Sequence, residues 1–314
     1  MERAHLLRHE TTFAIGGPAE YFTTVISEED VRGALADAER LRHSHTLLAG
    51  GSNVLIADEG VSGVVMCMRG GLLKARGTKI HVQCGVSLYE AIRETAANAL
   101  GGWERLSGIP GTVGGAIRGN AGAFGIEIGE VLLSVRALDR HTGHVREFKK
   151  DACAFSYRYS YFKKHPEWIL LDAVFALRET DTKESTTIIE ETVAEREKRH
   201  LQNVRAAGSF FVNPVVSSDV AIVFASEKHM EARAGRVPAG WLIEKVGMRG
   251  QREGGAASSQ MHANYLVNDT GEATAADVWK LAQRIATKVK AQYTVELSPE
   301  VTVMGSLDAF PPLV

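Results

Sequence analysis

A glycine-rich stretch between Ser107 and Glu127 is the first place where this sequence could bind an anion. Seven glycines fall within its twenty-one residues: Gly108, Gly111, Gly114, Gly115, Gly119, Gly122 and Gly125. Glycine lets a ligand approach the backbone closely, and successive bare amides form concave sites for phosphate. A glycine cluster is also compatible with a surface loop. Here, however, apolar residues such as Val113 and Ile117 are interleaved with the glycines, so we predict a buried loop wrapped around a ligand.

A second candidate phosphate site lies about sixty residues earlier, between two short apolar runs. The residues are Ala49 followed by Gly50, Gly51, Ser52 and Asn53. A tight turn of this composition between two buried strands would again present bare amides to a phosphate. The same four residues also make an ordinary turn. From this pattern alone, a phosphate site and a simple turn both remain open.

The bulk composition indicates a globular protein and excludes several function classes. The 314 residues are 45% hydrophobic and 24% charged, which gives length for two or three domains, and the net charge of −2 provides no field for nucleic acid. No segment resembles a signal peptide or a membrane span, so we expect a cytoplasmic protein without a membrane partner. Three cysteines and eleven histidines show no disulfide or metal-site spacing, and we expect no metal.

Helix and strand signals alternate irregularly along the chain. Helices are predicted after the N-caps Ser27, Ser87 and Thr274, each followed three residues later by an acidic residue as in a capping box. A polar helix is predicted over about 186–200. Strands are predicted at 46–48, 54–57, 64–68, 79–84, 132–138, 145–148, 168–177 and 295–303, with a strand-like start at 11–19. Because no regular βαβ repeat appears, we predict an α+β fold. A change of composition at 208–214 predicts the start of a C-terminal domain.

Six stretches then make the chain similar to the UDP-N-acetylenolpyruvoylglucosamine reductases, flavoenzymes of peptidoglycan precursor synthesis. In chain order they are TTFAIGGPA, GGSNVLIAD, SGIPGTVGGA with GNAGAFG, FSYRYSYFK, AGSFFVNP and LSPEV. The resemblance covers residues 11–305, nearly the whole chain. The spacing from Tyr157 to Ser209 leaves no room for the extra loop of the longer subclass, so the chain resembles the shorter one.

The resemblance implies a fold and a cofactor. It predicts an FAD-binding domain of the vanillyl-alcohol-oxidase type in two subdomains, at 1–75 and 76–204, and a substrate-binding α+β domain at 205–314. FAD would be bound without a covalent bond, and NADPH would be the co-substrate, sharing the substrate site. The implied FAD contacts are Gly50, Gly51, Ser52, Asn53, Ser107, Gly108, Ile109, Pro110, Gly111, Gly114, Gly115, Ala116, Asn120 and Gly122.

The implied reaction reduces the enolpyruvyl ether of UDP-N-acetylglucosamine enolpyruvate to the lactyl ether of UDP-N-acetylmuramate. Hydride would reach C3 of the enolpyruvyl group, and negative charge would develop at C2 and its carboxylate. Arg158 matches the family arginine that binds this carboxylate. Ser209 matches the proton donor to C2. Glu300 matches a glutamate beside the carboxylate, which could donate a hydrogen bond if burial keeps it protonated.

Further residues are implied as contacts to the substrate diphosphate or the nicotinamide: Tyr157, Asn213 and Arg249. His262 and Asn264 are compatible either with function or with satisfied polar groups in the core. The chain departs from the family pattern where Val212 replaces a usual lysine, which removes a cation near the expected nucleotide site. The other departures are Ala49 for glycine and Ser298 for an acidic residue.

Two other functions stay open beside the reductase. One is another FAD-dependent oxidase or dehydrogenase of the same cofactor fold, acting on a small alcohol. Ser209 and Glu300 argue against it, because such an enzyme needs no proton donor at C2. The second is a non-catalytic nucleotide-sugar-binding protein, which the loss of a cation at Val212 favours slightly. The expected partners are small molecules, a UDP-sugar and NADPH, and the expected oligomeric state is a monomer.

Overall fold

The computed structural model describes residues 1–199 and 203–314. These residues form two compact units. Unit 1 comprises Met1–His5, Ala19–Gly50 and Ser62–Lys198, and unit 2 comprises Leu6–Pro18, Gly51–Val61 and Arg199–Val314. The chain therefore crosses between the units several times near its N-terminus. The predicted division at residues 75 and 204 stays a prediction.

Unit 1 begins with a four-stranded sheet of order β1-β2-β5-β3. Its strands are β1 (Glu2–Leu6), β2 (Pro18–Val25), β5 (Val61–Met68) and β3 (His45–Leu48). The first helix, α1 (Glu28–Leu41), starts at the predicted N-cap, where the Ser27 hydroxyl and the Asp30 carboxylate complete a capping box. Strand β3 pairs in parallel with β5, and it ends directly before the glycines at 50 and 51.

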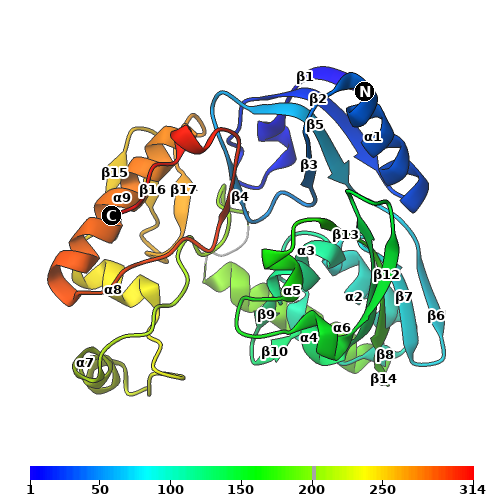
Figure 1. Cartoon of the computed structure of the whole chain (residues 1–314). Helices are drawn as coiled ribbons and strands as arrows, with labels where there is room; N and C mark the ends of the chain where they lie inside the picture. Colours follow the sequence, from blue (N-terminus) through cyan, green and yellow to red (C-terminus); the bar gives the residue numbers. More distant parts are fainter. Residues whose placement is uncertain (200–202) are drawn as a thin grey trace. The chain divides into compact units, whose positions relative to one another are not determined.

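The second sheet of unit 1 has five strands in the order β12-β11-β13-β7-β6. These are β12 (Val145–Lys149), β11 (Leu132–Asp139), β13 (Trp168–Ala176), β7 (Lys79–Gln83) and β6 (Leu73–Arg76), all antiparallel to their neighbours. Beside this sheet lie α2 (Leu88–Ala97), α3 (Val113–Gly119) and α6 (Thr182–Lys198), as Figure 1 shows. Short elements complete the unit: β8 (Leu100–Gly101), β9 (Gly122–Ala123), β10 (Ile126–Glu127), α4 (Ile128–Val131), α5 (Tyr161–Lys164) and β14 (Arg178–Glu179).

The core of unit 1 is one apolar cluster that joins α1 and α2 to both sheets. Val31 and Ala38 of α1, Ile92 of α2 and Phe175 of β13 belong to it, and all four are fully or almost fully buried. The helix faces are those that the 3.6-residue periodicity predicts. This core places the glycine-rich stretch, because Val113, Ala116 and Ile117 are part of the same cluster.

Unit 2 has its own core around a long helix, α9 (Ala275–Tyr293), which starts at the predicted capping box of Thr274 and Asp277. Two short helices, α7 (Ser218–Lys228) and α8 (Ala239–Lys245), precede it. A small antiparallel sheet contains β15 (Arg252–Glu253), β16 (Ala256–Ser258) and β17 (Leu266–Asn268). A parallel pair joins β4 (Val54–Ile56) to β18 (Thr302–Met304), so distant parts of the chain meet in this unit.

Several predicted elements are wrong in type or extent. Residues 11–17 form no strand, because Ala14 and Gly16 have positive φ, and β2 begins only at Pro18. The glycine-rich stretch is not a continuous loop, since α3 lies inside it. The expected strand at 295–303 is reduced to β18. The polar helix starts at Thr182 instead of 186, and its predicted end at residue 200 lies outside the described residues. At Ser87 only the hydroxyl cap is present, not the full capping box.

Candidate active site

Helix α3 organises the glycine-rich stretch of unit 1. The Thr112 hydroxyl accepts from the Gly115 amide at 3.2 Å and caps its first turn, and Asn120 ends it in the left-handed region. The Gly114 amide donates to the Cys84 carbonyl at 2.9 Å, and a Cβ at Gly114 would lie 2.8 Å from Cys84 Cβ. Gly114 therefore serves close packing inside the protein, whereas Gly115 is exposed and has only the Thr112 hydroxyl nearby.

The two glycine-rich turns approach each other closely within unit 1. A Cβ at Gly50 would lie 2.7 Å from the Gly111 Cα, so a side chain at residue 50 would force the backbones apart. Gly111 has φ +115, a conformation that favours glycine. The next residue, Gly51, has φ +62 and belongs to unit 2, where a Cβ would collide with the Glu10 carbonyl. Both glycine-rich turns thus contain glycines that the local backbone conformation requires.

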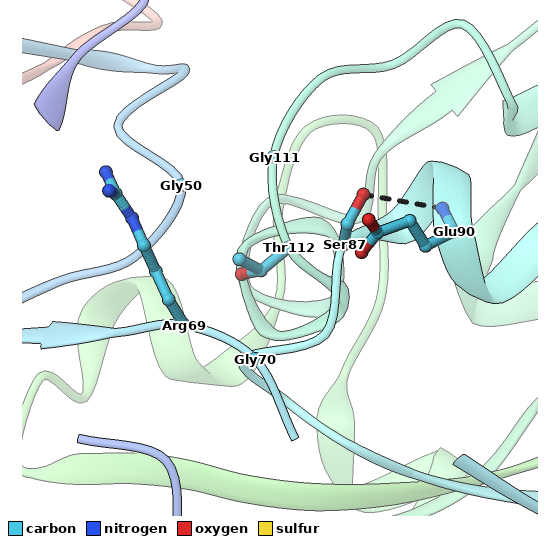
Figure 2. A pocket seen from close by; sticks show the side chains of 8 residues that line it. Gly50, Arg69, Gly70, Ser87, Glu90, Gly111 and Thr112 are labelled. Carbon is cyan, nitrogen blue, oxygen red and sulfur yellow. Dashed lines mark hydrogen bonds between the residues drawn. The ribbon is translucent and has the colours of Figure 1, made fainter. Parts of the chain in front are cut away.

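A cavity of about 270 Å³ opens between these turns, and all of its lining residues belong to unit 1. The lining residues are Gly50, Arg69, Gly70, Gly85, Ser87, Glu90, Gly111 and Thr112. Figure 2 shows the Arg69 side chain extending beside the backbone at Gly50. Pockets for drug-sized ligands measure about 300–1,000 Å³, so this cavity accommodates part of a dinucleotide. Its wall offers bare glycine backbone, hydroxyls and one guanidinium, which suit a phosphate, together with the carboxyl group of Glu90.

The predicted cofactor contacts include Gly50 and Gly111 at this cavity but not the other lining residues, which are Arg69, Gly70, Gly85, Ser87, Glu90 and Thr112. Ser87 was noticed only as the N-cap of α2, where its hydroxyl accepts from the Glu90 amide at 3.4 Å, the contact dashed in Figure 2. Arg69 and Gly70 directly follow strand β5, and Gly70 donates to the Gly85 carbonyl at 2.8 Å. The sequence signal for this cavity was glycine at the ends of strands, but only the pairing of the chain segments brings these glycines together.

Ser107 supplies an independent indication of a ligand in the same stretch. Its side chain is 3% exposed, and its buried hydroxyl has no hydrogen-bond partner in the described part of the chain. A buried polar group without a partner is costly, and native proteins satisfy nearly all of them. The neighbouring Gly108 is buried, Ile109 is half-buried and Pro110 is exposed. The Ser107 hydroxyl therefore fits a cofactor that accepts or donates a hydrogen bond there.

Asn120 joins the end of α3 to two neighbouring turns. Its amide nitrogen donates to the Glu127 carboxylate at 2.6 Å and to the Ser156 carbonyl at 3.0 Å. Its amide oxygen accepts from the Gly129 backbone at 3.2 Å, and the residue is fully buried. Both amide protons are thus engaged inside unit 1. The side chain fixes the turn that carries residues 157 and 158.

Arg158 occupies a strained position in that turn. Ser156 and Tyr159 exchange both backbone hydrogen bonds, so residues 157 and 158 form the tip of a tight turn. Arg158 has φ 54, a left-handed conformation that costs a non-glycine residue about 1–3 kcal/mol. Its guanidinium donates to the Gly122 carbonyl at 3.2 Å and lies 5.5 Å from the centre of the half-exposed Tyr157 ring. Strain of this kind persists at functional sites, where surrounding contacts enforce it.

Ser209 and Glu300 lie on adjacent segments of unit 2. The Glu300 amide donates to the Phe210 carbonyl at 2.8 Å, and Phe211 forms a bridge with Pro299. Both side chains are partly buried, and no described residue makes a hydrogen bond to the Ser209 hydroxyl. From unit 2 as well, Asn53 donates from its amide to the Glu300 carbonyl at 3.3 Å. The structure thus brings two members of the predicted catalytic trio together, and Arg158 belongs to unit 1.

The remaining substrate candidates have contacts of their own in unit 2. Asn213 accepts from the Ala239 amide at 3.0 Å and so caps the start of α8. Its backbone carbonyl accepts from the Arg236 guanidinium at 2.9 Å, which places a cation beside the position of Val212. Arg249 pairs with Glu244 at 2.7 Å. Burial lowers the pKa of His262, whose Nδ1 is buried without a hydrogen-bond partner among the described residues.

Two further properties of the described residues concern their helices and their cysteines. No helix in the ranges 1–199 and 203–314 is both long and apolar enough to cross a membrane. All three cysteines are buried and form no disulfide in the described part of the chain, and burial raises the pKa of Cys84 and Cys153. A cysteine whose pKa is raised is poorly suited to act as a nucleophile.

Comparison with known proteins gives matches over most of the chain. The model of the FAD binding domain matches residues 19–149, and that of the UDP-N-acetylenolpyruvoylglucosamine reductase C-terminal domain matches residues 199–304. These matches confirm the predicted FAD-binding domain, the cofactor FAD and the separate C-terminal domain.

Curated relatives and a solved structure agree with the family models. The UDP-N-acetylenolpyruvoylglucosamine reductase of Solibacter usitatus is 32% identical over 94% of both chains. That of Pelobacter propionicus is 35% identical over 95% of this chain and 93% of its own. The crystal structure of UDP-N-acetylenolpyruvylglucosamine reductase from Thermus caldophilus has a TM-score of 0.74 and 31% identity, and covers 95% of this chain and 97% of its own. The chain therefore belongs to the family of UDP-N-acetylenolpyruvoylglucosamine reductases, which are FAD-dependent oxidoreductases.

Proposed function

We propose that this protein catalyses the NADPH-dependent reduction of UDP-N-acetylglucosamine enolpyruvate to UDP-N-acetylmuramate, a step of peptidoglycan precursor synthesis. The observation that carries the proposal is the similarity to a reductase of this substrate over 94% of the chain. That similarity covers both domains that the reaction needs. One is a cofactor domain at residues 19–149, and the other is a C-terminal domain at residues 199–304.

The cofactor would be held by the turns of unit 1. The diphosphate of FAD would occupy the cavity between Gly50 and Gly111, with the Arg69 guanidinium and the Ser87 and Thr112 hydroxyls on its wall. Ser107 would gain the hydrogen-bond partner that its buried hydroxyl lacks among the described residues. The other proposed contacts in this unit are Gly108, Ile109, Pro110, Gly115, Ala116 and Gly122. When bound, FAD takes a hydride from NADPH and supplies it to C3 of the enolpyruvyl group.

Arg158 would bind the carboxylate of the enolpyruvyl group. A planar guanidinium binds a carboxylate through two parallel hydrogen bonds, and its stabilisation grows as negative charge accumulates there. The turn around Arg158 is held by Asn120 and by Lys163, whose ammonium donates to the Arg158 carbonyl at 3.0 Å. A side chain whose backbone is fixed in this way keeps its orientation without rearrangement during the reaction.

Ser209 would donate the proton to C2, and Glu300 would stabilise the charge on the adjacent carboxylate. A serine hydroxyl is a weak acid, but a carbanion-like C2 is a strong base, so the transfer is favourable. The hydroxyl of Ser209 is not engaged by any described residue, which supports its availability to a substrate. The bond between the Glu300 amide and the Phe210 carbonyl keeps the two residues on neighbouring segments. Tyr157, Asn213 and Arg249 remain proposed contacts to the nucleotide part.

An anaerobic titration tests this function. The purified protein is expected to be yellow, and acid precipitation should release all of its flavin, because FAD is held without a covalent bond. NADPH should bleach the flavin absorbance, and the enolpyruvyl substrate should restore it, with the lactyl ether as product. NADPH consumption without that substrate, matched by oxygen consumption, would favour a small-alcohol oxidase. Binding of the UDP-sugar without any change in flavin absorbance would favour a nucleotide-sugar-binding protein.

The proposed substrates also suggest where and in what form the protein acts. NADPH and nucleotide-sugars are cytoplasmic metabolites, so we propose a cytoplasmic enzyme. We also propose that it acts as a monomer with three domains, at 1–75, 76–204 and 205–314. Light scattering after size-exclusion chromatography would report the mass, and a dimer mass at working concentration would refute the monomer.

A further inference from the structure

The segment after Ser209 lies between two other segments of unit 2. On one side, the Glu300 amide donates to the Phe210 carbonyl at 2.8 Å, and the Val212 amide donates to the Ser298 carbonyl at 3.0 Å. On the other side, the Phe210 amide donates to the Asn264 carbonyl at 2.7 Å. Residues 210–212 therefore act as the middle strand of a small irregular sheet. The register of this strand sets the positions of both Ser209 and Glu300.

Asn264 completes the pairing through its side chain. Its amide oxygen accepts from the Phe211 backbone N–H at 2.9 Å, and its amide nitrogen donates to the Phe211 carbonyl at 2.8 Å. The side chain thus satisfies both backbone groups of one residue, as a neighbouring strand would. Asn264 is 2% exposed, and Phe211 is fully buried. Loss of either bond would leave a buried backbone group without a partner.

These contacts give Asn264 three hydrogen bonds to Phe210 and Phe211, the two residues directly after Ser209. The same two residues hold Glu300 and Pro299 on their other side. No hydrogen bond of the Asn264 side chain to Ser209 or Glu300 is present, so any influence on them must pass through the backbone of 210 and 211. This arrangement is that of a residue that holds the backbone beside a reacting group, not of a residue that contacts the substrate.

We propose that Asn264 is a positioning residue for the proton-transfer step, because it fixes the register of 210–211 and with it the placement of the Ser209 hydroxyl relative to Glu300. The inference rests on the proposed function, in which Ser209 donates the proton to C2. An asparagine is suited to this role because its amide both donates and accepts without charge. A displacement of about 1 Å in a reacting group can reduce a rate about 100-fold.

Asn264→Asp provides a selective test. The aspartate can still accept from the Phe211 N–H, but its second oxygen faces the Phe211 carbonyl. Ionised, that oxygen repels the carbonyl; protonated, it donates a hydrogen bond and restores the native pairing. Burial raises the pKa of a carboxyl group, so the protonated form should be accessible at mildly acidic pH. The variant should therefore regain function as pH falls.

The chain contains a matched control in Asn268. It is 3% exposed, belongs to the same unit, accepts from the Ala273 amide at 3.0 Å and donates to the Phe13 and Ala14 carbonyls at 3.3 and 3.4 Å. Asn268→Asp thus creates the same ionic conflict with buried carbonyls but does not involve residues 210 and 211. His262, with Glu244 and Arg249 near it, is present in all of the proteins, so each variant rate is divided by the wild-type rate at the same pH.

The measurement is rapid-mixing absorbance of the flavin, with each half-reaction observed separately. At pH 8, Asn264→Asp should be reduced by NADPH at close to the wild-type rate. Recovery of colour with the enolpyruvyl substrate should be about 100-fold slower. The deficit should shrink about tenfold per pH unit on acidification while the carboxyl remains mostly ionised. Asn268→Asp should show a lowered melting temperature but reoxidise within a few-fold of wild type.

Each outcome decides the proposal. Equal reoxidation rates in the two variants, or a deficit in Asn264→Asp that acidification does not relieve, would overturn it. If Asn264→Asp does not accumulate as folded flavoprotein, Asn264→Ser, whose shorter side chain cannot make both bonds and adds no charge, is compared with Asn268→Ser by the rate of reoxidation at pH 8. Failure of the proposed function is distinct, because wild-type flavin would then not reoxidise with the enolpyruvyl substrate at all.

Discussion

At the scale of single residues, the candidate chemistry depends on side chains that the surrounding backbone holds in fixed places. Arg158 occupies the left-handed region at the tip of a turn, and Asn120 and Lys163 bind the backbone of that turn. Ser209 follows Gly208, which has φ +73, and precedes two buried phenylalanines. In both cases neighbouring residues fix the backbone that carries the candidate side chain. Substitution there should change chemistry more than stability.

Replacement of the proposed acid tests the residue scale. Ser209→Ala should leave reduction of the flavin by NADPH nearly intact, because that step needs no proton donor at C2. Reoxidation by the enolpyruvyl substrate should slow by roughly 10²–10⁴-fold, the usual contribution of general acid catalysis. Rapid-mixing absorbance separates the two steps. Colour recovery at the wild-type rate would exclude Ser209 as the acid and make Glu300 the next candidate.

At the scale of elements, helix starts and close glycine contacts place the site. Helix α3 carries two adjacent glycines with different surroundings, Gly114 against Cys84 and Gly115 at the surface. Helix α9 is held at its start by its own capping box and by Asp58, whose carboxylate accepts from the Ala275 and Ala276 amides at 2.8 and 3.1 Å. Asp58 follows β4 and thus ties α9 to the β4–β18 pair. Each feature yields a prediction about one element.

Gly115→Val should separate cofactor binding from folding. Because its Cβ would meet only the Thr112 hydroxyl at 3.6 Å, the helix accepts the side chain, and valine is a better helix former than glycine. If FAD lies against this face, flavin content should fall while far-ultraviolet circular dichroism stays native. Gly114→Val should instead destabilise the fold through its contact with Cys84. Full flavin content in a folded Gly115→Val protein would remove this face from the cofactor site.

Asp58→Ala should lower the free energy of unfolding by about 1 kcal/mol, as loss of a helix cap does. The reason is that two amides at the start of α9 lose a charged acceptor. Urea denaturation followed by tryptophan emission would measure the change. The matched control is Glu59→Ala at the neighbouring exposed position, which should stay within about 0.5 kcal/mol of wild type. Equal midpoints for both variants would contradict the capping role.

At the scale of the whole molecule, both units contain a histidine that burial keeps neutral. The pKa of His45 in unit 1 and that of His262 in unit 2 are lowered from the ordinary value, in each case chiefly by burial. The unfolded chain then binds a proton near pH 6.5 that the folded chain accepts only at lower pH. Folding stability from these groups is therefore complete above about pH 6.5 and declines as pH falls below it.

His262→Gln should reduce this acid sensitivity. Between pH 7.5 and 5.5, the wild-type urea midpoint should fall, and the midpoint of the variant should fall less, because one proton-linked group is gone. The exposed His144 provides the control, since His144→Gln should retain the wild-type slope. The carboxyl groups with lowered pKa, including Asp30 and Asp277, contribute only at lower pH. Parallel pH profiles for wild type and His262→Gln would contradict the prediction.

The sequence by itself determined the family, the cofactor, the α+β class and the starts of three helices. Ser27, Ser87 and Thr274 are N-caps as predicted, because capping depends on residues three positions apart. Strand signals were equally local, and most predicted strands are confirmed within a few residues. Predictions of secondary structure failed where tertiary contacts outweigh the local sequence pattern. Residues 295–301 read as a strand, yet only β18 is regular, since Pro299 and its neighbours pair irregularly with 210–212.

Only the tertiary structure decided which residues meet. Arg69, Gly85 and Ser87 line one cavity with Gly50 and Gly111 because strands β3, β5 and β7 end near one another. Asn264 lies 53 residues from Phe211 in sequence, and it read equally well as a functional or a core residue until both of its amide bonds were visible. Capping and periodicity act over a few residues, whereas a cavity or a backbone clamp arises from segments that only the folded chain brings together.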